Sequence, residues 1–107
     1  MGPVSSDLRG HSRMQLRVPI KFFVGDRQYD GHTRDLSVGG VFIETDVAVR
    51  YGNRVRVVLS LPTGGEPVDA GAVVRWIEDR VGFGVQFDGL RAREVYALTR
   101  FLSRGAA

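Results

Sequence analysis

The chain has 107 residues, of which 43% are apolar and 25% charged, so its size and composition fit one globular domain with a single core. It contains no cysteine, which excludes disulfides and thiolate metal sites, and no apolar run approaches the roughly 20 residues that cross a bilayer. The formal charge is +3, and all but one of the 15 basic residues are arginine. Because such a bias is often only compositional, each arginine is judged by its position.

The segment 1–12 is rich in glycine and serine and shows no periodicity, which predicts a flexible tail before a single domain at 13–104. The segment also lacks the apolar stretch of a secretory signal. We therefore expect a cytoplasmic protein without membrane insertion.

After this segment, apolar and polar residues alternate in short runs bounded by turns, the pattern of half-buried strands. The runs cover residues 18–24, 28–34, 41–45, 54–61, 68–77 and 82–87. Pro19 cannot donate a backbone hydrogen bond, so the first strand is expected to lie at an edge or to begin irregularly. In the last run Phe83 and Val85 share one face, while Gly82 and Gly84 leave the other face bare.

The stretch 90–102 differs from the rest because its apolar residues recur at helical spacing. Asp88 is the candidate N-cap of this helix and Gly105 its candidate stop. Together the elements predict a mostly β fold, a six-stranded antiparallel β-barrel with a C-terminal α-helix. The strand edge near Pro19 and the helix are both candidate surfaces for a homodimer.

The sequence offers little for an enzyme. His11 and His32 have no spacing typical of a metal pair, so no metal site is expected and both are interpreted as solvated side chains. Ser37 lacks the pattern of a nucleophile elbow. The glycine pairs at 39–40 and 82–84 are not followed by helices, which argues against a Walker loop or a dinucleotide fingerprint. We expect neither catalysis nor a cofactor.

Two features remain: Arg13 and Arg17, placed four residues apart before the first strand, and the segment Asp35-Leu36-Ser37-Val38-Gly39-Gly40 between two strands. Each has an ordinary interpretation when taken alone, the first as surface arginines and the second as a turn. Trp76 is interpreted as a core or interface residue of its strand rather than as a stacking residue.

Together, Arg-x-x-x-Arg followed by Asp-x-Ser-x-x-Gly resembles the two-part signature of the PilZ domain, the bacterial receptor module for cyclic di-GMP. The resemblance extends over residues 11 to 102, including Gly39-Gly40-Val41-Phe42-Ile43 and Gly82-Phe83-Gly84-Val85-Gln86-Phe87. It is closest to the stand-alone, single-domain members of the family.

The resemblance implies roles in binding cyclic di-GMP that suit the chemistry of each residue. Arg13 and Arg17 match the family arginines, which can pair with phosphate, bind the O6/N7 edge of guanine or stack on the purine. Asp35 matches a position whose carboxylate accepts from guanine N–H groups.

Three further motif residues complete the predicted ligand site. Ser37 matches the family serine, which offers a hydroxyl to the ligand or holds the loop. Gly40 matches the motif glycine, where the absence of a Cβ lets the strand pass under a base of the ligand or adopt a backbone conformation closed to other residues, and Gly39 is a weaker candidate beside it. Ser12 occupies a position where members that bind a stacked ligand pair often carry another arginine, so the stoichiometry stays open.

The resemblance therefore implies a cyclic di-GMP receptor or adaptor that works by ordering: a loosely held segment with Arg13 and Arg17 is clamped onto the barrel, and an effector protein in motility, biofilm or polysaccharide control reads the changed surface. One alternative is a protein-interaction adaptor of the same fold that binds no nucleotide. Another is a small nucleic-acid binder, which the spread of 12 acidic residues disfavours.

Overall fold

The structure, a computed structural model, describes residues 13–106, with side chains described up to Arg104. The predicted tail at 1–12, with His11 and Ser12, lies outside the described residues. The elements are β1 (Met14–Gln15), β2 (Pro19–Val24), β3 (Arg27–Leu36), β4 (Gly40–Glu44), β5 (Arg54–Leu59), β6 (Val68–Glu78), β7 (Gly82–Phe87) and α2 (Ala92–Ala106).

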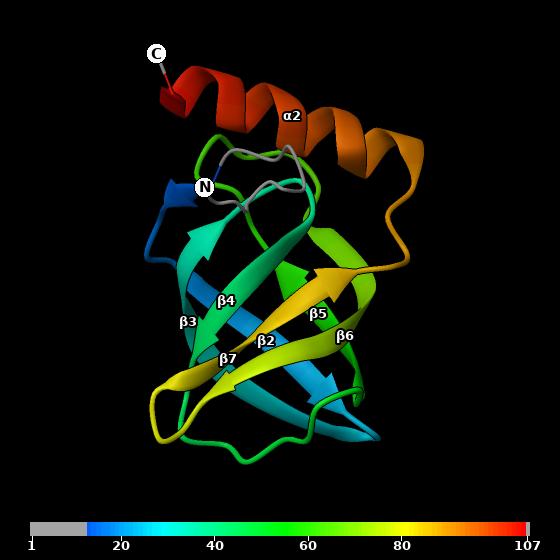
Figure 1. The fold of residues 1–107 in the computed structure, drawn as a ribbon. Helices are drawn as coiled ribbons and strands as arrows, with labels where there is room; N and C mark the ends of the chain where they lie inside the picture. Colours follow the sequence, from blue (N-terminus) through cyan, green and yellow to red (C-terminus); the bar gives the residue numbers. More distant parts are fainter. Residues whose placement is uncertain (1–12, 107) are drawn as a thin grey trace, which may run out of the picture.

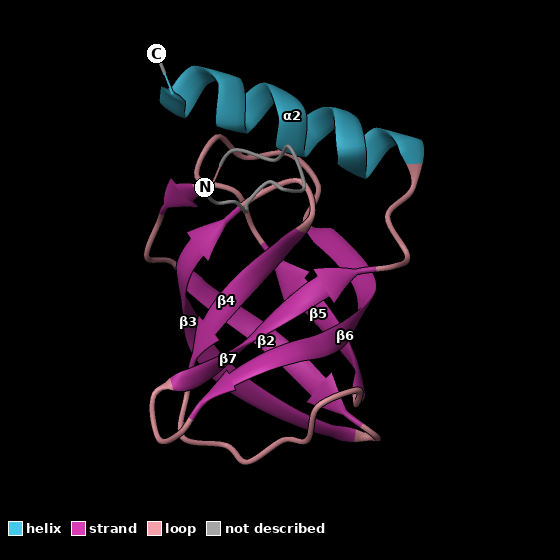
Figure 2. Cartoon of the chain, viewed as in Figure 1, coloured by secondary structure: helices cyan, strands magenta, loops and turns pink. Residues whose placement is uncertain are grey.

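All strand pairs are antiparallel, in the order β1-β3-β2-β5-β6-β7-β4, and an additional pairing of β3 with β4 closes the sheet on itself. In the described part of the chain, β2 to β7 thus form the predicted six-stranded barrel, while β1 is an extra short strand beside β3 (Figure 1). The helix lies across one end of the barrel, and loops cover the other end (Figure 2). The predicted mostly β fold is confirmed.

The barrel interior holds the core because each strand alternates inward and outward residues. Phe22 and Phe83 pack edge to face at 5.3 Å between ring centroids inside the barrel. From α2, Leu98, Phe101 and Leu102 are buried against the same core, so the helix closes its end of the barrel.

The prediction of an edge strand at Pro19 is wrong, since β2 pairs with β3 on one side and with β5 on the other. Pro19 is tolerated because it is the first residue of β2, where only the β3 partner is paired. The expected irregular start is confirmed: the Val18 N–H is bonded to the Thr33 Oγ1 at 3.0 Å instead of to a backbone carbonyl. The Pro19 edge is therefore not free for a dimer.

Both predicted ends of the helix are wrong. The helix begins at Ala92, and the Glu94 Oε1 accepts the Arg91 N–H at 2.9 Å, the return half of a capping box. Asp88 instead pairs with Arg54 at 2.8 Å. Gly105 does not stop the helix, which runs to Ala106.

Glu94 also fixes the helix to the barrel. Its side chain is 4% exposed, and its Oε2 accepts the Asp69 N–H of β6 at 3.3 Å and an Arg91 guanidinium N–H at 2.9 Å. Chiefly because of the Arg91 hydrogen bond, the pKa of Glu94 falls from its usual 4.5 to about 2. Within the described residues, α2 lacks the length and hydropathy of a bilayer-crossing helix.

Replacing Glu94 with Gln should lower the free energy of unfolding at neutral pH by about 2 kcal/mol, because charge-assisted hydrogen bonds from four N–H donors, three of Arg91 and one of Asp69, are weakened. A carboxyl whose pKa is lower in the folded state contributes fully above its unfolded pKa of 4.5 and loses that contribution as the pH falls towards 2. Urea unfolding at pH 7 and pH 3 measures this: the difference between wild type and E94Q should shrink at pH 3. E66Q is the control, since Glu66 is 72% exposed; equal losses in both variants would contradict the assignment.

Candidate functional site

The strand register brings residues from distant parts of the chain into one row on the outer face of the barrel. Asp35 lies opposite Gln15 of β1 on one side and opposite Phe42 of β4 on the other. Phe42 in turn lies opposite Gly84 of β7, and Gly84 lies opposite Trp76 of β6. This row is the centre of the candidate site.

Two register shifts shape the row. One lies between Thr33 and Asp35 and the other between Val74 and Trp76. The Thr33 side chain is buried in the barrel, whereas the Asp35 side chain lies on the outer face. Because of the register shift between these two residues, the Arg34 side chain also lies on the outer face, beside Asp35. The register shift therefore places two adjacent charged side chains, Arg34 and Asp35, on the same outer face.

Arg13 is hydrogen-bonded to the segment 35–40, the second part of the sequence signature. Its Nε donates to the Asp35 Oδ1 at 2.8 Å, and its Nη1 donates to the Ser37 Oγ at 3.3 Å. Its guanidinium carbon lies 5.7 Å from the centre of the Trp76 ring. β1 also pairs with the end of β3, so in this structure the segment is attached to the barrel without a ligand, and how loosely it is held stays a prediction.

Ser37 shapes the turn between β3 and β4. Its Oγ accepts the N–H groups of Gly39 and Gly40 at 3.1 and 3.2 Å, and its own N–H donates to the Gly40 carbonyl at 2.9 Å. The same Oγ accepts from Arg13. Of the two predicted roles of Ser37, holding the loop is the one for which the structure provides bonds.

The two motif glycines meet β7. A Cβ on Gly40 would lie 2.0 Å from the Val85 carbonyl oxygen, so the absence of a side chain is required by the neighbouring backbone of β7, and the expected passage under a ligand base stays a prediction. The Gly39 carbonyl accepts the Phe87 N–H at 2.9 Å. Both glycines therefore join the turn to the barrel wall.

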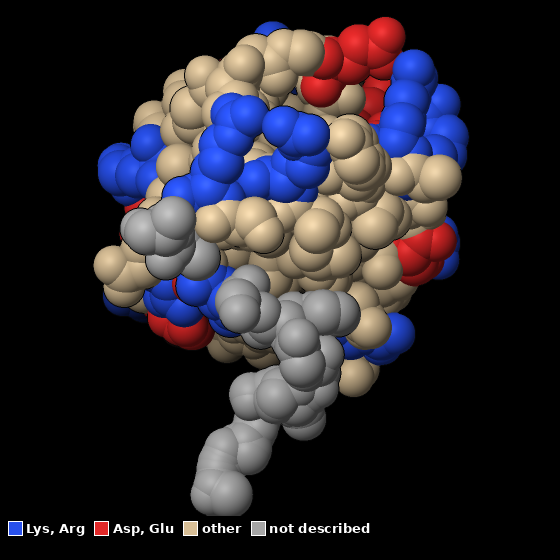
Figure 3. All heavy atoms as spheres, turned by 90° about the horizontal axis from the view of Figure 1, so that it is seen from above, with Lys and Arg blue, Asp and Glu red and all other residues tan. Residues whose placement is uncertain are grey.

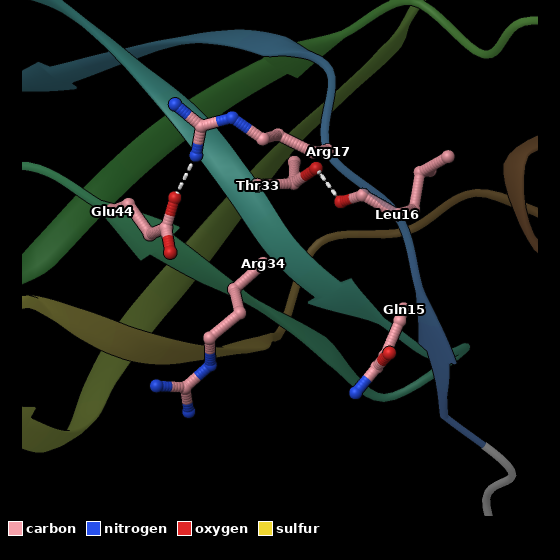
Figure 4. A pocket seen from close by; sticks show the side chains of 6 residues that line it. All are labelled: Gln15, Leu16, Arg17, Thr33, Arg34 and Glu44. Carbon is pink, nitrogen blue, oxygen red and sulfur yellow. Dashed lines mark hydrogen bonds and ion pairs between the residues drawn. The ribbon is translucent and has the colours of Figure 1, made fainter.

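Arg17 follows β1 along the same edge of β3 as Arg13, but its side chain has a different carboxylate partner. It is paired with Glu44 and is 64% exposed. The ion pair borders an open pocket of about 370 Å³ (Figure 4). The pocket is lined by Gln15, Leu16, Arg17, Thr33, Arg34 and Glu44.

Arg34 is a site residue that the sequence analysis missed. Its Nη1 and Nη2 donate to the two carboxylate oxygens of Glu78, each at 3.0 Å, and its guanidinium carbon lies 3.7 Å from the centre of the Phe42 ring. The Glu78 hydrogen bonds raise the pKa of Arg34 and lower the pKa of Glu78. The strand period alone would not place Arg34 outside next to Asp35; the register shift does.

Trp76 was interpreted as a core or interface residue, and the core interpretation is wrong. Its side chain is 38% exposed on the outer face and lies flat over Gly84, where a Cβ would meet the indole ring at 2.1 Å. The bare face of β7 at Gly84 was the signal for this arrangement. Trp76 therefore offers a ring at the edge of the site, next to Arg13.

The end of the molecule that carries α2 and β1 is rich in basic side chains. Viewed from that end, basic side chains lie across the surface, whereas acidic side chains stay towards its margin (Figure 3). Such a distribution attracts anions to the neighbourhood of β1. Among residues 13–106, no three His, Cys, Asp or Glu side chains gather as a metal site would require, and His32 is exposed.

Over residues 7–104 the chain matches the PilZ domain, and it belongs to that family. A comparison with curated protein sequences finds no match.

Among solved structures, the chain is similar to the Bacillus subtilis inhibitor of motility MotI/DgrA, with a TM-score of 0.79 and 17% identity over 92% of this chain and 51% of that one. It is also similar to the PilZ domain of CeSA from a cellulose-synthesizing bacterium, with a TM-score of 0.68 and 17% identity over 90% and 99% of the two chains. The Borreliella burgdorferi PlzA protein in complex with c-di-GMP has a TM-score of 0.61 and 9% identity over 78% and 31%. The chain thus spans about half of MotI/DgrA, and these likenesses show the fold.

Replacing Gly40 with Ala should destabilise the domain by about 3 kcal/mol, because the new methyl group meets a backbone carbonyl that cannot move without breaking the β4–β7 pairing. Thermal unfolding measures the effect. G71A is the matched control, because a Cβ on Gly71 meets only side-chain atoms, the nearer being the Asp88 Oδ1 at 3.1 Å. A G40A protein as stable as G71A would contradict the close approach.

Proposed function

We propose that this PilZ domain is a cyclic di-GMP receptor whose ligand site is the row around Asp35 together with the Arg17 pocket. The observation that supports it best is that Arg13 donates direct hydrogen bonds to Asp35 and Ser37, which lie 22 and 24 residues further along the chain. PlzA, a protein of similar fold, has been solved in complex with c-di-GMP.

The groups of the site match the groups of the ligand. Cyclic di-GMP carries two phosphodiester charges and two guanines. Arg17, which makes one ion pair and is largely exposed, has free donors for a phosphate. Asp35 can accept from guanine N–H groups once Arg13 turns to the ligand, and the exposed ring of Trp76 can stack on a base.

In this proposal the ligand exchanges ion pairs and does not order a free segment. Arg13 and Arg17 are already paired with Asp35 and Glu44, so the domain keeps its arginines close to their binding positions. Exposed ion pairs contribute only about 0–1 kcal/mol, so their exchange costs little compared with the gain from a doubly charged ligand.

The effect of ligand binding would be transmitted from the site to the helix end of the domain through β1. This strand comprises two of the three residues between Arg13 and Arg17 and contacts α2, so a shift of the two arginines would change the surface at the helix end. We infer that an effector protein reads this surface and that the domain acts by binding. MotI/DgrA, whose name describes an inhibitor of motility, gives a precedent for motility control on this fold.

Isothermal titration with cyclic di-GMP tests the proposal. The wild type should bind, and R13A and R17A should each weaken binding roughly tenfold or more, since each removes charge-assisted hydrogen bonds to the ligand. Trp76 is the single tryptophan of the chain, so its fluorescence should change on binding in the wild type.

R54A is the control, because Arg54 is 70% exposed and paired with Asp88, away from the site row. It should bind as tightly as the wild type. A wild type that gives no heat at micromolar concentration, or an R13A/R17A double variant with unchanged affinity, would refute the proposal and favour the adaptor that binds no nucleotide.

A further inference from the structure

The guanidinium of Arg34 is held in one orientation by groups in its own plane. Glu78 takes one N–H from each terminal nitrogen at 3.0 Å, and the Asp35 Oδ2 takes the Nε–H at 3.4 Å. Both carboxylates are acceptors only, so they occupy three of the five donors of the guanidinium and offset its charge.

One flat side of this guanidinium is covered and the other is open. The Phe42 ring lies 3.7 Å from its central carbon and is itself 0% exposed, whereas the Arg34 side chain is 38% exposed. Arg34 also lines the pocket that contains Gln15 and Arg17 (Figure 4). The exposed part of Arg34 is therefore the side facing away from Phe42, next to the pocket.

Arg34 and Arg17 consequently offer different groups to a ligand. Arg17 has one carboxylate partner and a mostly exposed guanidinium, which suits a phosphate. Arg34 has two carboxylate partners in its plane, so what remains available is chiefly its flat cationic face, which suits a stacked base.

We propose that Arg34, supported by Phe42 from below and held by Glu78, forms a nucleobase subsite on which a purine of the ligand stacks. Glu78 acts as a positioning residue: it keeps the guanidinium flat and does not touch the base. The inference rests on the proposed function, since it names where one guanine of cyclic di-GMP lies.

The barrel carries a matched control for this arrangement. Arg56 of β5 donates to both carboxylate oxygens of Asp69 at 2.8 and 2.7 Å and lies 5.0 Å from the Phe23 ring. It has the same chemistry as Arg34, Glu78 and Phe42, but it lies on strands β5, β6 and β2, outside the site row. Its replacement should have the same structural cost and no effect on the ligand.

Titration calorimetry with cyclic di-GMP on R34K, R34Q and R56K tests the subsite. Lysine keeps the charge but has no flat face, so R34K and R34Q should both lose roughly tenfold in affinity, while R56K stays within about twofold of the wild type. Equal affinity of R34K and wild type would overturn the subsite. So would a loss in R34Q alone, because charge would then be what matters.

E78Q gives a second measurement whose sign separates the two roles of Arg34. If a base stacks on the held face, removing the carboxylate loosens Arg34 and weakens binding a few fold. If Arg34 binds a phosphate through its donors, removing the competing negative charge tightens binding, which would overturn the subsite. The melting temperatures of all variants show whether they are folded.

The same experiments distinguish a failure of the Arg34 subsite from a failure of the proposed receptor function. A wild type that does not bind cyclic di-GMP refutes both. A wild type that binds and loses affinity in R13A, with R34K unchanged, leaves the receptor standing and removes only the Arg34 subsite.

Discussion

The pairing of β3 with β4 is the constraint on which the rest of the structure depends. It closes the barrel, and it begins at a turn that Ser37 holds by accepting two backbone N–H groups from inside the loop. The turn is pressed against β7 so closely that Gly40 has no room for a Cβ. The residues that close the barrel therefore also position the candidate site.

The site is built from opposed charges that lie on the surface instead of in the core. Arg13 and Arg34 share the carboxylate of Asp35, and Arg34 is additionally paired with Glu78 across the barrel wall. Exposed ion pairs of this kind stabilise the fold only slightly, but they orient side chains that would otherwise sample many rotamers. Their contribution is preorganisation, which under the proposed function would lower the entropic cost of binding the dianionic ligand.

The arginines differ in what their partners leave free. By composition alone the arginines are equivalent, but their surroundings differ. Arg17 keeps free N–H donors, whereas Arg34 chiefly keeps one exposed face of its guanidinium. The aromatic residues complete this division, since Phe42 supports Arg34 from below and the exposed Trp76 lies beside Arg13. A ligand with separate phosphates and bases matches such a surface better than a uniform polyanion does.

The sequence by itself determined the six strands of the barrel and the barrel class, because alternation of period two and turn residues are local properties. It did not predict β1, whose two residues are too few to show alternation. It did not determine the helix ends, which depend on the bonds of Glu94 to β6, or the interior position of β2. Nor did it place Arg34 and Trp76 in the site. Their outward positions arise from two register shifts, and a register shift is decided by which strands pair, which only the tertiary structure decides.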